Sequence, residues 1–338
     1  MKIALIGFGV VGQGVVQILR DKGDMLRDRY GFSPRIVGVA TRSRGTVVSA
    51  DGLSLDWLLT TPHLHDLPAG STAITGWDAL RVIRDSGADV IVEVTPTNLQ
   101  TAQPALDLCR AALSAGKHLV LANKGPIALA YGELTAAAAA AGVLLRFEAT
   151  VMAGTPSIRL GMEALAGCTI SRARGILNGT TNYMLTQMDG GMTYAQALAE
   201  AQALGYAEAD PTADVDGWDA AGKAIILAAA LFGTSLSFDD MTVRGIASIT
   251  PEAIAEARAA GERWKLIAEV TPEGGSVQPH RISMSHPLAG VMGAVNAVTF
   301  TTDLMGDITL IGAGAGGVQT GFAVLSDLLD IHRHQLAL

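Results

Sequence analysis

The amino-acid sequence predicts an α/β protein with a parallel sheet in its N-terminal part and an α+β domain with a mixed or antiparallel sheet after it. The chain has 338 residues, which is long for a single hydrophobic core and favours two domains. Up to about residue 150, short apolar strands alternate with helices, the pattern of a parallel sheet with helices on both faces. Beyond that point, short strands follow one another with turns between them, which is typical of antiparallel pairing.

The elements follow from apolar runs and the residues that interrupt them. In the first part, strands are predicted at the chain start, in 35–43, 88–98 and 143–150, and at the beginning of 117–129, whose remainder is predicted as a loop; helices are predicted after the first glycine turn and in 77–87, 101–116 and 131–142. In the second part, helices are predicted in 155–167, 193–208 and the apolar end of 205–231, a strand, turn and helix in 169–188, a helix and strand in 250–270, and strands in 277–285, 296–303 and 307–311. The expected domains are 1–148, 149–311 and a C-terminal helix in 312–338 that returns to the first domain.

Composition excludes several classes of protein. The chain is 49% hydrophobic and 17% charged, and its formal net charge is −8, which argues against nucleic acid or an acidic membrane surface as a partner. Its two cysteines, Cys109 and Cys168, form no disulfide framework and indicate a reducing compartment. The start of the chain lacks the features of a signal peptide, and the uncharged run 308–326 is too rich in glycine for a membrane span. We therefore expect a soluble, cytoplasmic protein.

The first motif is Gly7-Phe8-Gly9-Val10-Val11-Gly12, which follows a strand and opens a helix. In this context the glycines allow a tight turn, a close approach of backbone amides to a pyrophosphate, and close packing of helix on strand. The alternative is a generic glycine turn. The motif, in its strand–helix setting, predicts a Rossmann-type domain that binds a dinucleotide through the N-terminus of the helix.

The end of the second strand bears on which dinucleotide is bound. A carboxylate there binds the ribose 2′-hydroxyl of NAD, but the strand ends in Thr41-Arg42-Ser43-Arg44. Arginines suit a 2′-phosphate because the guanidinium pairs with phosphate through two hydrogen bonds. A solvated basic loop is the alternative. The segment favours NADP over NAD.

Four further segments have polar groups or glycines where a ligand could bind. Asn123 and Lys124 follow a buried strand at the edge where open α/β sheets bind ligands, although a surface lysine beside a turn would look similar. The segments 147–158 and 175–185 are rich in backbone amides and hydroxyls, as are ordinary helix starts. Glycines in 312–317 precede the last helix and repeat the pattern of the first motif, although a simple turn is the alternative.

The segment 205–231 places acids and one lysine before and within an apolar helix. Asp219 and Lys223 are four residues apart and share a helix face, and Asp216 is expected one turn earlier on that face. The helix continues with apolar residues all round, so it is predicted to be buried. Burying a lysine and its acids is costly unless they are paired or used, and such a lysine can exchange protons near neutral pH. A purely structural ion network is the alternative. The pairs His63/His65 and His332/His334 lack the further ligands of a zinc site, and no catalytic metal is predicted.

Together these motifs resemble the homoserine dehydrogenases over nearly the whole chain. The blocks are "GFGVVG", "ANKGP", "EATVMAGTP", "GILNGTTNYML", "LGYAEADPTADVDGWDAAGKAIILA", "HPLAGVMGAVNAV" and "GAGAGGVQTGFAVLSDL". The resemblance implies an NAD(P)-binding domain, a catalytic domain whose sheet forms a homodimer interface, and interconversion of L-aspartate 4-semialdehyde and L-homoserine in threonine and methionine biosynthesis. Many members carry a regulatory ACT domain that this sequence does not show, so feedback inhibition through one is not expected.

The resemblance also implies roles for individual residues. Lys223 would transfer a proton at the substrate oxygen, and Lys124 would assist at the substrate and nicotinamide. The implied substrate-binding residues are Glu208, Asp214, Gly179, Thr180 and Tyr206, with Asp219 orienting Lys223. The implied cofactor contacts are the first motif, Thr41, Arg42, Arg44, Thr95, Lys124, Gly205 and Gly316. The implied ligands of a structural sodium ion, mainly through backbone carbonyls, are Glu148, Val151, Ala153 and Thr155.

Two other readings are consistent with the same residues. One is a different amino-acid-linked Rossmann reductase, of the saccharopine reductase or aspartate dehydrogenase type. The other is a redox-sensing protein that binds NADP without turnover, against which the buried acid–lysine cluster speaks, because a sensor has no need of a proton donor.

Overall fold

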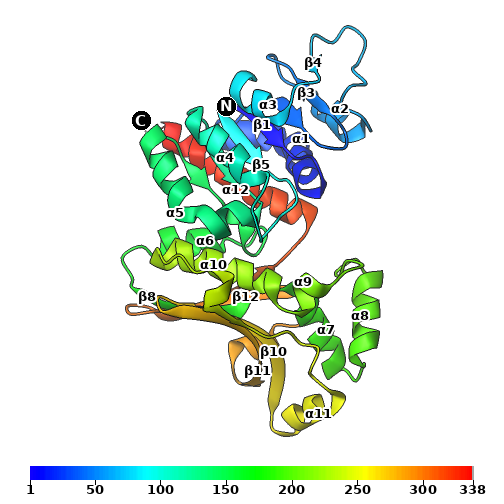
Figure 1. The fold of residues 1–338 in the computed structure, drawn as a ribbon, viewed down its shortest axis with the longest axis vertical. Coiled ribbons are helices and arrows are strands. Elements are labelled where there is room, and N and C mark those ends of the chain that lie inside the picture. The colour runs from blue at the N-terminus through cyan, green and yellow to red at the C-terminus, as the bar shows by residue number, and fades with distance from the viewer. Residues whose placement is uncertain (337–338) are drawn as a thin grey trace. The chain divides into compact units, whose positions relative to one another are not determined.

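The computed structural model describes residues 1–336 and divides into two compact units (Figure 1). Unit 1 comprises Met1–Gly154 and Gly316–Leu338, and unit 2 comprises Thr155–Ala315. Unit 1 contains a seven-stranded sheet, here called sheet A, and unit 2 contains a six-stranded sheet, here called sheet B. The predicted α/β class, with a parallel-rich sheet followed by a mixed sheet, is confirmed.

Sheet A has the strand order β4-β3-β2-β1-β5-β6-β7. Its strands are β1 (Lys2–Ile6), β2 (Arg35–Ala40), β3 (Thr46–Val48), β4 (Ile74–Thr75), β5 (Val90–Glu93), β6 (His118–Leu121) and β7 (Leu145–Arg146). Strands β2, β1, β5, β6 and β7 pair in parallel, whereas β3 and β4 extend the sheet in antiparallel fashion. Strand order reverses between β1 and β5, which creates the crevice at which such sheets bind ligands.

The helices of unit 1 cover sheet A and bury its apolar strands. They are α1 (Val10–Tyr30), α2 (Leu55–Thr60), α3 (Ala79–Asp85), α4 (Ala105–Ser114), α5 (Lys124–Ala141), the 3₁₀ turn η1 (Glu148–Thr150) and α12 (Gly317–Leu336). The central strands are almost continuously apolar because they are covered on both faces: Ile3, Leu5 and Val90 are fully buried.

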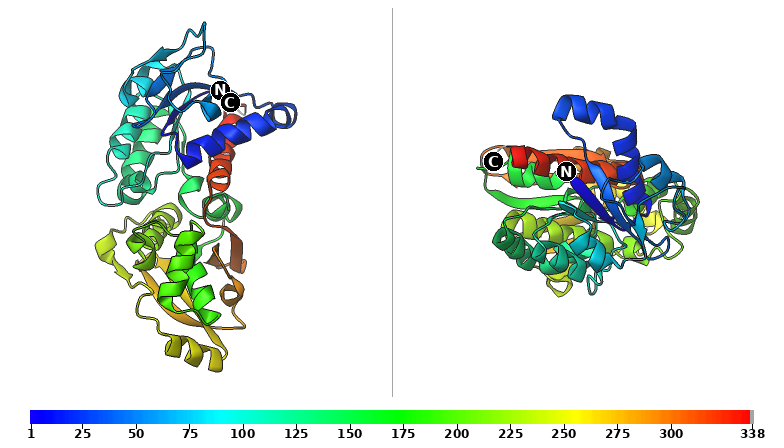
Figure 2. Two further views of the ribbon diagram at one scale, coloured as in Figure 1. Left: turned by 90° about the vertical axis from the view of Figure 1, so that its right-hand side faces the viewer. Right: turned by 90° about the horizontal axis from the view of Figure 1, so that it is seen from above.

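Helix α12 returns to unit 1 and crosses α1 near the beginning of both helices (Figure 2). Glycines make this crossing close. A Cβ atom on Gly14 would lie 2.3 Å from the backbone oxygen of Gly317, and one on Gly321 would lie 2.8 Å from the backbone of Gly14. The glycine-rich start of α12 therefore packs against the helix that follows the first glycine motif.

Unit 2 is built on sheet B, whose order is β13-β12-β8-β10-β11-β9. Its elements are α6 (Ser157–Arg159), the π-helical turn η2 (Leu160–Ala164), β8 (Ile170–Ile176), α7 (Gly179–Asp189), α8 (Tyr194–Ala203), α9 (Thr212–Val215), α10 (Trp218–Phe232), η3 (Phe238–Asp240), β9 (Met241–Val243), α11 (Pro251–Ala259), β10 (Glu262–Thr271), β11 (Gly274–Ser283), η4 (Pro287–Gly290), β12 (Val295–Thr302) and β13 (Gly306–Ala313). All pairs are antiparallel except β11 with β9, so the sheet is mixed.

Two local predictions are wrong. Residues 124–129 were predicted as a loop but form the first turns of α5, because Pro126 stands in the first helical turn, where its missing N–H is not needed. The predicted strand 143–150 is reduced to β7, and Glu148–Thr150 forms a 3₁₀ turn instead. None of the helices described is both long and apolar enough to cross a membrane.

Candidate active site

The first glycine motif forms a cradle between β1 and α1. Gly7 has a φ of 98°, and a Cβ atom there would lie 2.7 Å from the backbone of Val94, so only glycine fits. Gly12 packs against Gly7, whereas a Cβ atom on Gly9 would meet nothing within 4 Å. Gly9 therefore faces open space at the N-terminus of a 21-residue helix, and the cradle fits a pyrophosphate.

The remaining residues of this motif differ in exposure. Phe8 is buried, Val10 is 73% exposed and Val11 is partly buried. The guanidinium of Arg44 lies over the Phe8 ring, 5.0 Å from its centroid. The two segments that the sequence linked to a dinucleotide, the glycine turn and the basic turn, are thus in contact.

The basic turn after β2 uses its two arginines differently. Arg44 donates hydrogen bonds to the backbone oxygens of Pro62 (3.2 Å) and Leu58 (3.3 Å), and also to that of Thr61. The Thr41 hydroxyl closes the turn by donating to the Gly45 oxygen at 3.0 Å. Arg42 is exposed. Backbone oxygens of the chain therefore accept the hydrogen bonds of Arg44, and Arg42 is the arginine that faces solvent.

Thr95 and Asn123 meet at the carboxyl edge of sheet A. The Asn123 amide donates to the Thr95 backbone oxygen (3.3 Å), the Thr95 hydroxyl (3.2 Å) and the Pro96 oxygen (3.2 Å). Lys124 is partly buried, and its backbone N–H donates to the Thr97 hydroxyl at 3.3 Å. These contacts place Thr95 and Lys124 at the β5–β6 part of the ligand-binding edge.

In unit 2, Lys223 is held by two acceptors. Its ammonium donates to Asp219 Oδ2 and to the Leu177 backbone oxygen, both at 2.7 Å. Lys223 is 8% exposed and lies on α10, which is apolar because it packs on sheet B. An ammonium has three N–H bonds, so two protein contacts leave one for a ligand.

Asn178 joins this pair to a second carboxylate. Its side-chain amide donates to Asp214 Oδ1 at 2.6 Å and to Asp219 Oδ2 at 3.1 Å. Burial and the neighbouring charge of Asp219 raise the pKa of Asp214, while the Asn178 hydrogen bond opposes the rise. Sequence analysis did not single out Asn178; its position before Gly-Thr-Thr at a helix start was the available signal.

The start of α7 borders the same cluster. Gly179 is the first helical residue, and the buried Thr180 donates through its hydroxyl to the Tyr206 backbone oxygen at 2.5 Å. The ring of Tyr206 contacts that of Tyr183 in a tilted arrangement, with centroids 4.9 Å apart. Contacts through α7, its cap and the loop before α9 therefore join one cluster of residues. It consists of Lys223, Asp219, Asp214, Thr180 and the backbone of Tyr206.

Three acids of the 205–231 segment behave differently from Asp214 and Asp219. Glu208 and Asp210 are exposed in the loop that also contains Gly205. Asp216 was predicted on the helix face of Lys223, and this is wrong. Gly217, with a φ of 91°, separates α9 from α10 and leaves Asp216 exposed at the end of α9.

The segment proposed for a cation has an unusual backbone. Met152 and Ala153 are consecutive non-glycine residues with positive φ, 59° and 48°. Glu148 is buried at 3% exposure in η1, and the Thr155 hydroxyl donates to the Ala313 oxygen at 3.0 Å. Within residues 1–336, no cluster of three or more His, Cys, Asp or Glu side chains is arranged for a metal ion, so a cation here would depend on backbone oxygens.

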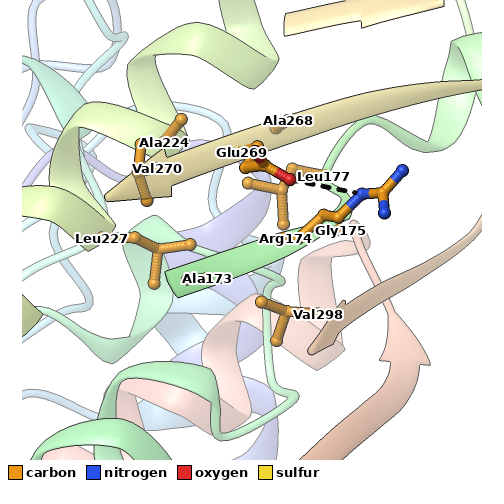
Figure 3. A pocket seen from close by; sticks show the side chains of 10 residues that line it. All are labelled: Ala173, Arg174, Gly175, Leu177, Ala224, Leu227, Ala268, Glu269, Val270 and Val298. Atoms are coloured by element: carbon orange, nitrogen blue, oxygen red, sulfur yellow. Dashed lines mark ion pairs between the residues drawn. The ribbon is translucent and has the colours of Figure 1, made fainter. Parts of the chain in front are cut away.

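A depression between sheet B and α10 is not a substrate site. Figure 3 shows Leu227 and Ala224 of α10 facing Val270 and Val298 across it, with the Arg174–Glu269 ion pair (3.5 Å) at its side. The space among these mostly apolar side chains does not admit a water molecule.

Comparisons with known proteins agree with this geometry. The sequence model described as homoserine dehydrogenase matches residues 156–329, and that described as homoserine dehydrogenase, NAD binding domain, matches residues 7–148. An NAD⁺-dependent homoserine dehydrogenase of Pseudomonas canavaninivorans is 44% identical, covering 98% of this chain and 96% of the relative. A homoserine dehydrogenase of Methanocaldococcus jannaschii is 41% identical, covering 98% of both chains.

A solved structure gives the same result for the fold. A hyperthermophilic archaeal homoserine dehydrogenase in complex with NADPH superimposes with a TM-score of 0.84 at 29% identity, covering 98% of both chains. The other reductase types considered from the sequence are not favoured. The chain belongs to the homoserine dehydrogenase family of NAD(P)-dependent oxidoreductases.

Proposed function

We propose that the chain interconverts L-aspartate 4-semialdehyde and L-homoserine, with Lys223 as the proton donor and acceptor at the substrate oxygen. The observation that carries this proposal is the position of the Lys223 ammonium, which is buried and oriented by Asp219 and the Leu177 oxygen at 2.7 Å each. We assign cofactor binding to unit 1, and catalysis and dimerisation to unit 2. A bound nicotinamide supplies the hydride or accepts it.

Residues of the chain transfer the proton and stabilise the charge that accompany this hydride transfer. The third N–H of Lys223 would donate a proton to the substrate carbonyl oxygen, which gains negative charge as the aldehyde is reduced. Asp219 fixes the direction of the ammonium. In the reverse direction, the same amine accepts the hydroxyl proton of homoserine.

Substrate recognition follows from the charges of an amino acid. Asp214 offers a carboxylate to the substrate ammonium, and Glu208 and the Tyr206 backbone lie in the loop next to it. The N-terminal amides of α7 at Gly179 and Thr180 suit the substrate carboxylate. Thr95 and Lys124 in unit 1, with Gly205 and Gly316, complete the proposed ligand contacts.

Replacement of Lys223 by alanine tests the proton role. General acid–base catalysis contributes about 10²- to 10⁴-fold, so Lys223→Ala should lower kcat by that factor while the dissociation constant of NADPH stays near the wild-type value. Lys22→Ala, an exposed lysine on α1, is the matched control and should be fully active. Turnover that survives in Lys223→Ala would rule out the assignment.

For the cofactor we propose NADP(H), with Arg42 facing the 2′-phosphate. Arg44 already donates to three backbone oxygens, and Arg42 is exposed beside it. Comparison of kcat/KM with NADP⁺ and NAD⁺ tests this preference, and a higher value with NAD⁺ would contradict it. One relative is named an NAD⁺-dependent enzyme, so NAD⁺ is the alternative cofactor that this comparison tests.

We also propose a structural sodium ion held by Glu148, Val151, Ala153 and Thr155, mainly through backbone oxygens. Met152 and Ala153 are consecutive non-glycine residues in the left-handed region, a sparsely populated backbone geometry that a bound ion would stabilise. A thermal midpoint that rises with NaCl and does not rise with choline chloride at equal ionic strength would support the ion; equal effects would exclude it.

We place the reaction in the cytoplasm, in the biosynthesis of threonine and methionine, and expect a homodimer. Cys109 and Cys168 are both free thiols, as expected in a reducing compartment. Expression in a bacterial strain that requires homoserine should restore growth without it. Continued dependence on homoserine, with the protein present in the soluble fraction, would contradict this role.

A further inference from the structure

Glu93 is a buried carboxylic acid at the crevice of sheet A that the proposed mechanism does not use. It is the last residue of β5, it pairs with Ile6 of β1 and Leu121 of β6, and it is 0% exposed. The crevice lies between β1 and β5, where strand order reverses. A charged residue at the end of a buried apolar strand is costly unless it has a use.

The contacts of Glu93 organise the residues expected at the cofactor. Its Oε1 atom accepts hydrogen bonds from the Thr95 backbone N–H, at 3.0 Å, and from the Thr95 hydroxyl. Thr95 in turn accepts two hydrogen bonds from Asn123, the residue before Lys124. Glu93 thus holds the two loops that follow β5 and β6 in one arrangement.

The same contacts reach the phosphate cradle. A Cβ atom on Gly7 would lie 2.9 Å from the Thr95 nitrogen, the atom that donates to Glu93. The glycine turn therefore packs directly on the backbone that the carboxylate fixes. A change in the charge of Glu93 acts on groups at the crevice itself.

Glu93 is poised to change its charge near neutral pH. Its second oxygen, Oε2, is buried and has no hydrogen-bond partner among the described residues. Burial raises the pKa of Glu93 to about 7, and hydrogen bonds from Thr95 and Asn123 oppose the rise. The titratable group that faces it from α4 is Cys109, whose pKa is raised by burial and by the Glu93 charge, so this thiol stays neutral. From β1 and β6 it faces the apolar Ile6 and Leu121, with the cation Lys124 next after Asn123.

We propose that Glu93 is a positioning residue of the cofactor site whose ionised carboxylate favours the oxidised cofactor, with its positively charged nicotinamide ring, over the neutral reduced form. The proposal rests on the cofactor site assigned to unit 1. A carboxylate shielded from solvent interacts with a nearby cation much more strongly than one in water. As pH rises through 7, Glu93 loses its proton, and the affinity for oxidised cofactor should rise relative to that for reduced cofactor.

Binding measurements test this directly. Dissociation constants of NADP⁺ and NADPH are measured between pH 6 and pH 8.5, and the 2′-phosphate is common to both, so its titration cancels in their ratio. In the wild type, the ratio of the NADP⁺ to the NADPH constant should fall about three- to tenfold over this range. In Glu93→Gln, which keeps an acceptor oxygen for Thr95 but cannot ionise, the ratio should not change. Glu133→Gln, an exposed acid on α5, should behave as wild type.

A second measurement tests the role of Glu93 if the Glu93→Gln variant fails to fold. Calorimetric titrations of the wild type at pH 7, in buffers of different ionisation enthalpy, report the protons released on binding. Binding of NADP⁺ should release more protons than binding of NADPH. Equal release, or a wild-type ratio that is constant with pH, would overturn the role of Glu93. A wild-type protein that binds neither NADP⁺ nor NADPH would contradict the proposed function instead.

Discussion

Asn178 uses both polar atoms of its side chain within the candidate active site. Its oxygen accepts from the Thr181 N–H and the Thr181 hydroxyl, both at 2.8 Å, and so caps α7. Its nitrogen donates to Asp214 and Asp219. One buried amide therefore fixes the start of a helix and keeps two like-charged carboxylates at a set spacing beside Lys223.

Replacing Asn178 should affect stability and catalysis together. Asn178→Ala removes an N-cap, which costs about 1 kcal/mol of unfolding free energy. It also removes one hydrogen bond from each of Asp214 and Asp219, and displacement of catalytic groups should lower kcat/KM by about 10- to 100-fold. Because the Asn178 hydrogen bond lowers the pKa of Asp214, its loss should move the acidic limb of the pH profile to higher pH.

The matched control is Thr193→Ala, which removes the capping box of α8. It should cost a similar free energy of unfolding and leave kcat/KM unchanged. Chemical denaturation and steady-state kinetics over pH measure both quantities. Equal kinetics in the two variants would show that Asn178 acts on the helix alone.

Sequence patterns found Lys223 and Asp219 of the site and did not single out Asn178 or Glu93. Lys223 and Asp219 could be predicted because residues four apart on an apolar helix share one buried face. Asp216 was wrongly included because periodicity does not show that Gly217 takes a positive φ and breaks the helix. Asn178 contacts Asp214 across 36 residues of the chain, and the Thr95 that Glu93 holds contacts Asn123 across 28 residues. Spacing along the chain does not encode such contacts.

At the level of elements, the crossing of α1 and α12 depends on three glycines outside the first glycine motif. Gly14, Gly317 and Gly321 remove side chains where the two helix backbones meet. The crossing ties the first and last helices of unit 1 to each other, so the C-terminal segment is part of the fold of this unit.

Two glycines of α1 allow a matched test of this crossing. A Cβ atom on Gly14 would lie 2.3 Å from the Gly317 oxygen, whereas one on Gly23 would meet nothing within 4 Å. Gly14→Ala should lower the unfolding free energy by about 1–3 kcal/mol or more, because neither backbone yields easily. Gly23→Ala should raise it by about 0.5–1 kcal/mol, because alanine is the better helix former. Denaturant unfolding measures both, and a Gly14→Ala variant as stable as wild type would disprove the close crossing.

The elements themselves were predictable in proportion to their length. Long periodic segments such as α1 and β10 were found, since many residues repeat the same pattern. The antiparallel strands β3 and β4 have three and two residues, too few for alternation to show. They extend sheet A only because β3 pairs with β2 and β4 pairs with β3. The start of α5 was missed because Gly125 and Pro126 suggest a loop when they are seen without their partners.

At the scale of the whole molecule, sheet B has one face suited to self-association. Pairing places Ile311 opposite Ala297, and Thr309 opposite Thr299, which in turn lies opposite Arg174. Side chains on directly paired residues share a face. Ile311 is 53% exposed on this face, at the edge strand β13. An exposed apolar side chain on an edge strand, beside hydroxyls and paired charges, fits an interface between two copies of the chain.

Ile311→Glu should therefore weaken the proposed homodimer. A buried interface charge without a partner is costly, and a two-fold interface would contain it twice. Sedimentation equilibrium should give about 70 kDa for the wild type, twice the chain mass of 34.9 kDa, and a lower average mass for Ile311→Glu at low micromolar concentration. Leu80→Glu, which adds the same charge at an exposed leucine on α3 in unit 1, should stay dimeric. Because dimerisation stabilises the folded chain by mass action, the thermal midpoint of the wild type should also rise with protein concentration, and that of Ile311→Glu should rise less. A monomeric wild type, or an Ile311→Glu variant as tightly dimeric as Leu80→Glu, would place the interface elsewhere.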